Sequence, residues 1–163
     1  MSLNTNLLQP TGFKISINRS IYPTMEFFVQ SVDHGSVSCE PGPEPYSRIG
    51  GTWHAGDKLE FSEITFNMLL DESMEAYTEM YDWMKRLVET KSTTPMDGTT
   101  DRPSDAEDIT LSILTSANTV AKTIIYKDCI PTLLGNFNME AGAGDVPVLV
   151  YPISFRYTYF DIQ

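Results

Sequence analysis

The alternation of apolar and polar positions predicts that most of this chain forms β-strands. Phe13, Ile15 and Ile17 alternate with polar residues, which is the period of two expected for a strand with one buried face. Residues 25–32 are predicted to form a second strand, after a turn at 22–24 that contains a proline. The chain therefore begins with two strands.

A long strand is predicted over residues 57–70, although its apolar positions change phase. They are odd-numbered up to Phe61 and even-numbered from Ile64 onward. A β-bulge near Ser62 or Glu63 would explain the change, because one extra residue moves all later side chains to the opposite face. A strand buried on both faces would explain it equally well.

One helix is predicted, over residues 74–89, where neither glycine nor proline occurs. Ser73 is a suitable N-cap, Glu75 lies in the first turn, and Lys85 and Arg86 lie near the last turn. An apolar stripe at spacings of three and four should face a sheet. The stripe consists of Met74, Tyr77, Tyr81, Met84 and Val88.

The C-terminal part predicts further strands. Residues 109–115 and 119–127 form a plausible hairpin around 116–118, followed by a strand or turn around 133–139 and a glycine turn at 141–144. A last strand pair ends the chain, and one of its strands has a continuous apolar face. That face is Ile153, Phe155, Tyr157 and Tyr159.

Two segments interrupt this pattern. Residues 39–56 are rich in proline and glycine and form a long loop, of the kind that is usually functional or flexible. Residues 91–108 are polar and acidic, so they are predicted to form an exposed loop. With about seven strands and one helix, we expect a single domain over residues 1–163. Its fold class should be mainly β: an antiparallel β-sandwich or flattened barrel with one flanking α-helix.

Charge and composition narrow the possible functions. The 163 residues carry 22 acidic and 11 basic side chains, a net charge of −11, which argues against a surface that grips a phosphate backbone. The sequence has no signal peptide and no apolar run long enough to span a membrane, so we expect a soluble protein made in the cytoplasm. The two cysteines, Cys39 and Cys129, are too few and too far apart to indicate a disulfide framework or a metal site.

Catalytic motifs are absent from the sequence. His34 and His54 are the only histidines and have no metal-binding partner nearby, and there is no nucleophile elbow and no phosphate-binding glycine motif. The adjacent Asp71 and Glu72 are better explained as favourable charges at the start of the predicted helix than as an acid–base pair. We therefore predict no enzyme, no cofactor and no metal site.

The order and spacing of several landmarks resemble the tail tube proteins of contractile-tailed bacteriophages. This family shares its fold with the inner tube of type VI secretion and related injection machines. The resemblance covers nearly the whole chain. Its landmarks are the strand Phe13–Ile17, Phe27–Ser31, Ala55-Gly-Asp57, Phe61, Thr65, Asp71-Glu72, the helix with Trp83, Cys129–Gly135 and Phe155–Phe160.

The resemblance implies a structural subunit that forms hexameric rings, which stack into a tube with an acidic channel. Double-stranded DNA would pass through this channel during ejection without specific binding. The other implied partners are the tail sheath, baseplate and tape-measure proteins, within a virion assembled in the host cytoplasm. Residues 40–56 would reach an adjacent ring, with Arg48, Trp53 and His54 as candidate contacts. The helix would face the sheath through Glu75, Glu79, Asp82 and Lys85.

Two alternatives remain open at this point. A protein of the same fold could start the tube at the baseplate or terminate it. A protein of a different class, a small-ligand-binding β-barrel, would require an interior cavity with converging polar groups.

Overall fold

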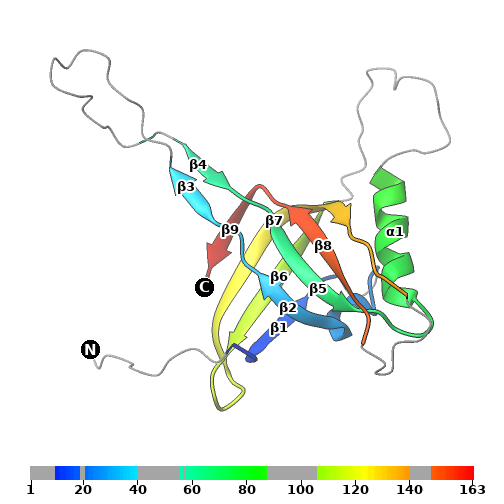
Figure 1. Cartoon of the computed structure of the whole chain (residues 1–163). Coiled ribbons are helices and arrows are strands. Elements are labelled where there is room, and N and C mark those ends of the chain that lie inside the picture. The colour runs from blue at the N-terminus through cyan, green and yellow to red at the C-terminus, as the bar shows by residue number, and fades with distance from the viewer. Residues whose placement is uncertain (1–9, 19–20, 40–55, 57, 88–105, 140–147) are drawn as a thin grey trace, which may run out of the picture.

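The computed structural model describes residues 10–18, 21–39, 56, 58–87, 106–139 and 148–163 (Figure 1). Within these residues it has nine strands, one α-helix and one short 3-10 helix, so the expectation of a mainly β fold is confirmed. The elements are β1 (Phe13–Ser16), η1 (Met25–Phe27), β2 (Val29–Asp33), β3 (Val37–Cys39), β4 (Leu59–Phe61), β5 (Ile64–Leu69), α1 (Glu75–Leu87), β6 (Glu107–Leu114), β7 (Val120–Leu134), β8 (Val150–Arg156) and β9 (Tyr159–Ile162).

The strands form one large antiparallel sheet and one small one. The large sheet has the order β1-β6-β7-β8-β5-β2, with β9 also paired to β7, and the small sheet contains β3 and β4. β7 is shared between two layers. The first part of β7 pairs with β6 and β9, and β6 also pairs with β1. These four strands form one layer, which we call the β6 layer. The last part of β7 pairs with β8, which pairs with β5, and β5 pairs with β2. These four strands form the other layer, which we call the β5 layer.

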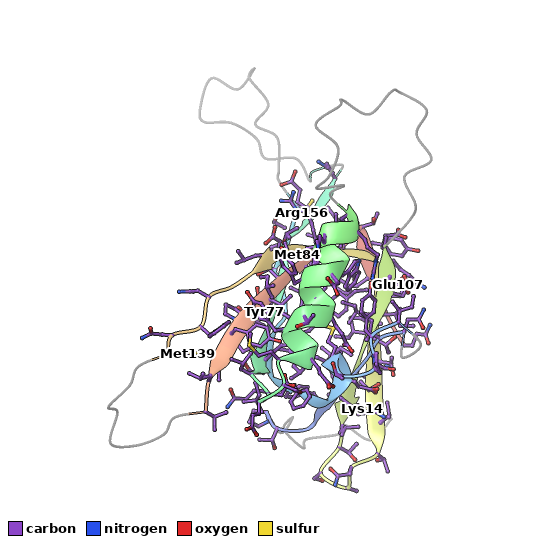
Figure 2. All side chains as sticks on the ribbon, turned by 90° about the vertical axis from the view of Figure 1, so that its right-hand side faces the viewer. Lys14, Tyr77, Met84, Glu107, Met139 and Arg156 are labelled. Atoms are coloured by element: carbon purple, nitrogen blue, oxygen red, sulfur yellow. The ribbon has the colours of Figure 1, made fainter. Side chains whose placement is uncertain are left out.

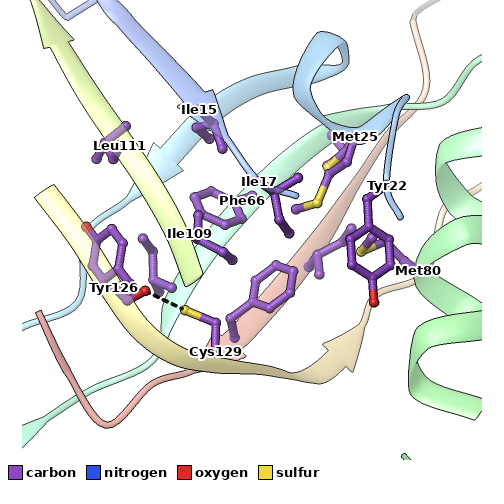
Figure 3. Close-up of a cluster of buried hydrophobic side chains, with 14 of the residues drawn as sticks. Ile15, Ile17, Tyr22, Met25, Phe66, Met80, Ile109, Leu111, Tyr126 and Cys129 are labelled. Carbon is purple, nitrogen blue, oxygen red and sulfur yellow. Dashed lines mark hydrogen bonds between the residues drawn. The ribbon is translucent and has the colours of Figure 1, made fainter. Parts of the chain in front are cut away.

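A bend in β7 allows the sheet to turn from one layer to the other. Asp128 has a φ of 55°, a left-handed conformation that is uncommon for residues other than glycine. The inward positions change phase there: Tyr126 is buried before the bend, and Cys129 and Pro131 are buried after it. This is the effect of a bulge, and Figure 3 shows Tyr126 and Cys129 on the curved part of the strand.

The core lies between the two layers and the helix. Ile109 and Tyr126 enter it from the β6 layer, and Phe66 enters it from the β5 layer (Figure 3). On the helix side, the Trp83 ring stacks on Tyr22 with the centroids 4.5 Å apart. The largest side chains with almost no exposed surface are Trp83, Tyr22, Tyr126, Tyr151, Phe66, Phe155 and Met25. Aromatic side chains therefore fill much of the interior.

The helix begins differently from the sequence prediction. Ser73 was expected to be the N-cap, but Asp71 Oδ2 accepts the hydrogen bond from the Glu75 N–H at 3.0 Å. Ser73 instead donates its hydroxyl to the same Asp71 oxygen at 2.6 Å. The Ser73 hydroxyl lowers the pKa of Asp71, and the Glu75 N–H adds to this effect, because both bonds favour the ionised carboxylate. Asp71 is thus the capping residue.

The buried face of α1 also differs from the prediction. Ala76, Met80 and Trp83 are fully buried, whereas Tyr81 of the expected stripe is 52% exposed. Tyr77 from that stripe does pack partly against the core. The predicted buried face is rotated about the helix axis by about one residue position from the observed one. A stripe that includes Tyr81 places Trp83 on the opposite side of the helix.

Three other predictions are corrected by the structure. Residues 25–32 are not one strand, because Met25–Phe27 form a 3-10 helix before β2 begins. The exposed loop predicted up to Asp108 ends earlier, because β6 starts at Glu107. The phase change at Ser62 and Glu63 is neither a bulge within one strand nor a strand buried on both faces. It is the break between β4 and β5, which belong to different sheets.

The C-terminal strands follow the prediction in part. The hairpin at 116–118 is confirmed by a backbone hydrogen bond from Asn118 N to Thr115 O, and Asn118 has a φ of 57°. The predicted final strand breaks after Arg156, where β8 ends and β9 begins at Tyr159. Tyr159 is 43% exposed, so it does not continue the buried face that ends at Tyr157. In the described part of the chain, no helix has the length and apolarity needed to cross a membrane.

Candidate assembly surfaces

The most prominent surface feature is a two-stranded arm formed by β3 and β4, which projects away from the rest of the molecule (Figure 1). Val37 in β3 is 43% exposed and Leu59 in β4 is 57% exposed. Cys39 at the end of β3 pairs with Leu59 at the start of β4. Cys39 and Leu59 therefore mark the outer end of the paired part of the arm.

The base of the arm is a close backbone crossing. A Cβ added to Gly35 would lie 2.6 Å from the Glu63 carbonyl oxygen and 2.7 Å from the Ser62 carbonyl oxygen, so only glycine fits there. Ser62 N donates to the Ser36 carbonyl oxygen at 3.0 Å. Beside this crossing, the Glu63 carboxylate lies 3.7 Å from the Arg156 guanidinium at the end of β8. Both side chains are largely exposed, so this ion pair adds little stability.

An aromatic junction joins the base of the arm to the sheet. It consists of His34, Phe61, Tyr126, Tyr157 and Phe160, which come from four separate segments of the chain. Phe160 makes edge contacts with His34 at 5.1 Å and with Phe61 at 5.6 Å between ring centroids. It also lies 6.0 Å from the Tyr126 ring and 6.2 Å from the Tyr157 ring. Such tilted and edge-on arrangements are the favourable ones for aromatic rings.

A short hydrogen bond closes this junction. Nδ1 of His34 lies 2.6 Å from the Tyr126 hydroxyl oxygen. Burial raises the pKa of Tyr126 far above its ordinary range, so the phenol keeps its proton at neutral pH. Its hydroxyl can therefore donate to a neutral His34 ring or accept from the His34 N–H. Burial also raises the pKa of the neighbouring Cys129 thiol to about 12, which makes this thiol unreactive.

The helix α1 lies toward the viewer in Figure 2, and most of its residues predicted to face a sheath are exposed. Glu75, Asp82 and Lys85 are exposed, and the Lys85 ammonium lies 5.6 Å above the centroid of the exposed Tyr81 ring. Glu79 is different: it is partly buried and accepts a hydrogen bond from the Thr24 N–H at 3.4 Å. Glu79 therefore holds the helix against the segment before η1, and three of the four predicted residues remain available on the surface.

Unpaired strand sides form a third candidate surface. Among the described strands, β1 pairs with β6 alone and β2 pairs with β5 alone, so each presents one side without a strand partner. β9 likewise pairs only with β7, and its Ile162 is 61% exposed. Such edges expose backbone N–H and C=O groups that another strand can bind.

The remaining predicted residues are distributed as follows. Arg48, Trp53 and His54, the candidate inter-ring contacts, lie outside the described residues. His34 directly follows the last residue of β2. Across the described segments, no three His, Cys, Asp or Glu side chains are grouped so that they could hold a metal ion.

Sequence reasoning missed the arm and the junction. Val37 and Leu59 could have been noticed as isolated apolar residues beside a proline-rich segment, but nothing local shows that they are exposed. The junction had no local signal at all, because Phe61, Tyr126 and Phe160 are far apart in sequence.

Solved structures of tube, cap and baseplate assemblies contain chains with a similar fold. A chain in the structure of the anti-feeding prophage cap, described as the tube-terminating cap, matches with a TM-score of 0.69 and 14% identity over 100% of this chain and 95% of that one. A chain in the six-fold symmetrised anti-feeding prophage baseplate matches with a TM-score of 0.67 and 13% identity over 99% and 97%. A chain in the sheath–tube complex of the extracellular contractile injection system PVC matches with a TM-score of 0.63 and 16% identity over 98% and 93%.

The likeness covers at least 98% of this chain and at least 93% of each of the three matched chains. It confirms, at the level of the fold, the resemblance to contractile tail-tube proteins seen in the sequence. No protein-family model matches the chain, and no curated protein matches it in sequence. The likeness to solved structures shows that the chain has the fold of these tube, cap and baseplate chains.

Proposed function

We propose that this protein is a structural, ring-forming subunit of the tube of a contractile tail of the bacteriophage type. The observation that carries the proposal is the full-length likeness to chains of contractile assemblies, with at least 98% of this chain covered in each case. The neighbouring structures are named as cap, baseplate and sheath–tube complexes, which are structural assemblies and not enzymes. We accordingly assign no catalytic role and no cofactor.

In the proposed ring, six copies associate through their strand edges. The unpaired sides of β1 and β2 in one chain supply the backbone groups that such pairing needs. A closed ring leaves no free edge, which removes the tendency of an exposed edge to aggregate. The six-fold symmetry named for one of the similar structures supports this stoichiometry.

Rings would stack through the arm. Arg48, Trp53 and His54, from residues 40–56, would contribute further contacts, and the strands on either side of this segment pair through Cys39 and Leu59. The exposed Val37 and Leu59 side chains would be buried by the adjacent ring. The exposed face of α1, with Glu75, Asp82 and Lys85, would meet the sheath. Baseplate and tape-measure proteins would be the partners at the tube end and in the channel.

The net charge of −11 supports an acidic channel. A channel surface rich in carboxylates repels a phosphate backbone, so double-stranded DNA would pass through it without specific binding. In the described residues, acidic side chains are concentrated at α1 and the turn before it, which is the proposed sheath side, so the channel carboxylates would come from other parts of the subunit. The cluster at α1 consists of Asp71, Glu72, Glu75, Glu79 and Asp82, against Lys85 and Arg86. The protein would then reside in the virion after assembly in the host cytoplasm.

A second candidate within the same fold is a tube initiator at the baseplate or a tube terminator. It is favoured by the likeness to chains in a baseplate structure and in a tube-terminating cap. Such a protein would form a single ring that does not stack with copies of itself. The small-ligand-binding barrel has no comparable support, because large aromatic side chains such as Trp83, Tyr126 and Tyr151 occupy the interior.

The test is negative-stain electron microscopy of the purified protein together with its mass in solution. Stacked hollow rings with the mass of multiples of six chains would support the tube subunit. Isolated rings that never stack would favour the initiator or terminator. A persistent monomer at high concentration would count against the proposed function.

A further inference from the structure

We propose that the C-terminal strand β9 fixes the direction of the arm, with Phe160 as the positioning residue that connects the two. The inference goes beyond the tube fold itself, because it assigns a role to the last strand of the chain. The role of the arm as the contact between rings rests on the proposed function.

The arm has few attachments of its own. Val37, Ser38 and Cys39 are all exposed, as are Leu59 and Glu60, so the arm buries little apolar surface along its length. Its base is held by the backbone hydrogen bond from Ser62 to Ser36 and by an exposed contact between the hydroxyls of the same two residues at 3.3 Å. These bonds join the two strands of the arm to each other, and they do not join the arm to the sheet.

Side chains of the junction supply the connection to the sheet that these bonds lack. Phe61 contacts the Tyr157 ring at 5.9 Å and His34 is hydrogen-bonded to Tyr126, and Phe160 contacts all four of these residues. Its ring lies between two groups at the base of the arm, His34 and Phe61, and two groups of the sheet and its C-terminal connection, Tyr126 and Tyr157. The hydrogen bond between His34 and Tyr126 lies in the same cluster. Removing the Phe160 ring would remove four aromatic contacts at once and would leave His34 and Phe61 without their shared neighbour.

β9 is itself well fixed, as a positioning element must be. Its four residues pair with β7 from Ile124 to Lys127. Beyond the strand, Thr123 and Gln163 exchange two backbone hydrogen bonds, at 2.9 Å and 2.8 Å. Because β7 is also the strand shared by both layers, a side chain held by β9 is held by the most extensively paired strand of the sheet.

The consequence concerns tube assembly. An arm that pivots at Gly35 would present its exposed apolar residues in many directions, and the ordering cost of docking would increase. With the junction intact, the arm is held in one direction before a second ring arrives. The C-terminal strand would therefore control how well rings stack without contacting the second ring itself.

The experiment compares Phe160→Ala with Tyr159→Ala in the full-length chain. Tyr159 is the adjacent residue on the same strand and is 43% exposed on the other face, so it is a matched control. Amide hydrogen exchange is measured on dissociated subunits at residues 36–39 and 59–62, and at β5 and β8 as internal references. We expect exchange in the arm to be about three- to tenfold faster in Phe160→Ala, with β5 and β8 less affected. Tyr159→Ala should resemble the original protein.

Unchanged exchange in the arm, or an equal increase throughout the sheet, would overturn the inference. If Phe160→Ala does not fold, His34→Ala provides a second measurement, because His34 is largely exposed and its loss removes the same connection from the arm side. Electron microscopy separates this inference from the proposed function. Faster exchange in the arm with no rings from any variant would contradict only the tube role. Rings with unchanged arm exchange would contradict only the coupling.

Discussion

β4 and β5 are neighbours in sequence, separated only by Ser62 and Glu63, yet they are stabilised in different ways. In β5, Ile64, Phe66 and Met68 have no exposed surface, and the strand pairs on both sides with β2 and β8. In β4, Leu59 is 57% exposed and the strand pairs only with β3. The apolar residues of β4 and β5 thus belong to two different regions. Those of β5 lie in the core of the subunit, and those of β4 belong to the projecting arm.

The difference shows where each region obtains its stability. Burial of apolar surface stabilises the body within a single chain, at roughly 25 cal/mol per Å². The arm gains almost nothing from this source by itself, and a two-stranded ribbon is marginally stable in water. Its exposed apolar residues are consistent with a surface that becomes buried on assembly. Mutations in the body should therefore change folding, and mutations in the arm should change association.

The largest effect is expected from Trp83→Ala in the body. Trp83 is fully buried, stacks on Tyr22 and lies 5.5 Å from the Phe155 ring, so its loss leaves a large cavity. We expect the free energy of unfolding in urea to fall by about 3–5 kcal/mol. Tyr81→Ala on the exposed side of the same helix is the control and should cost less than about 1 kcal/mol. Similar losses from both variants would show that the helix does not contribute its Trp83 face to the core.

A smaller loss is expected from Asp128→Val at the bend of β7. The left-handed backbone there is unfavourable for a β-branched residue, so the substitution should cost about 1–2 kcal/mol. Asp128→Gly should retain the stability of the original protein, because glycine adopts this conformation readily. Urea unfolding measures both variants. Equal stability of the two would mean that the bend does not require this conformation.

Asp71→Ala should lower the free energy of unfolding by about 1 kcal/mol at neutral pH, because it removes the cap of α1. The pKa of Asp71 is lowered in the folded protein, so its contribution is present above the ordinary value of 3.8 and is lost as the pH falls through the lowered pKa. The original protein and the variant should therefore differ less at about pH 2 than at about pH 7. Glu72→Ala, at the exposed neighbour, is the control. A difference between the two proteins that grows in acid would contradict the assignment of the cap.

The smallest effect on folding is expected from changing Val37 and Leu59 to serine together. Both are exposed, so the free energy of unfolding of the dissociated subunit should change by no more than about 0.5 kcal/mol. Stacking of rings should nevertheless be reduced, which sedimentation and electron microscopy would show. Val120→Ser, at a residue that is 59% exposed next to the β6–β7 hairpin, is the control. Normal tubes from the double variant would show that the arm is not a stacking surface.

Local patterns in the sequence were sufficient for some of the elements. Alternating residues located β1, β6 and β8, and the absence of glycine and proline located the helix, because burial of one face imposes its period on the sequence. The family resemblance also came from the sequence, through the order of its landmarks along the chain. Glu75, Asp82 and Lys85 are exposed, as charged residues on a helix usually are, and their contact with a sheath stays a prediction. Glu79 was assigned to the same face although it contacts the Thr24 backbone.

By itself, the sequence determined that this protein is a mainly β, acidic protein with one helix, since these properties depend on composition and on periods within a few residues. Only the tertiary structure decided which face of the helix is buried, that the pattern ending at Leu70 is divided between body and arm, and that Phe160 meets His34 and Phe61. These features depend on contacts between residues far apart in the chain. A local period shows that one face of a strand or helix is apolar, but the neighbour that covers it is set by how the whole sheet folds around β7.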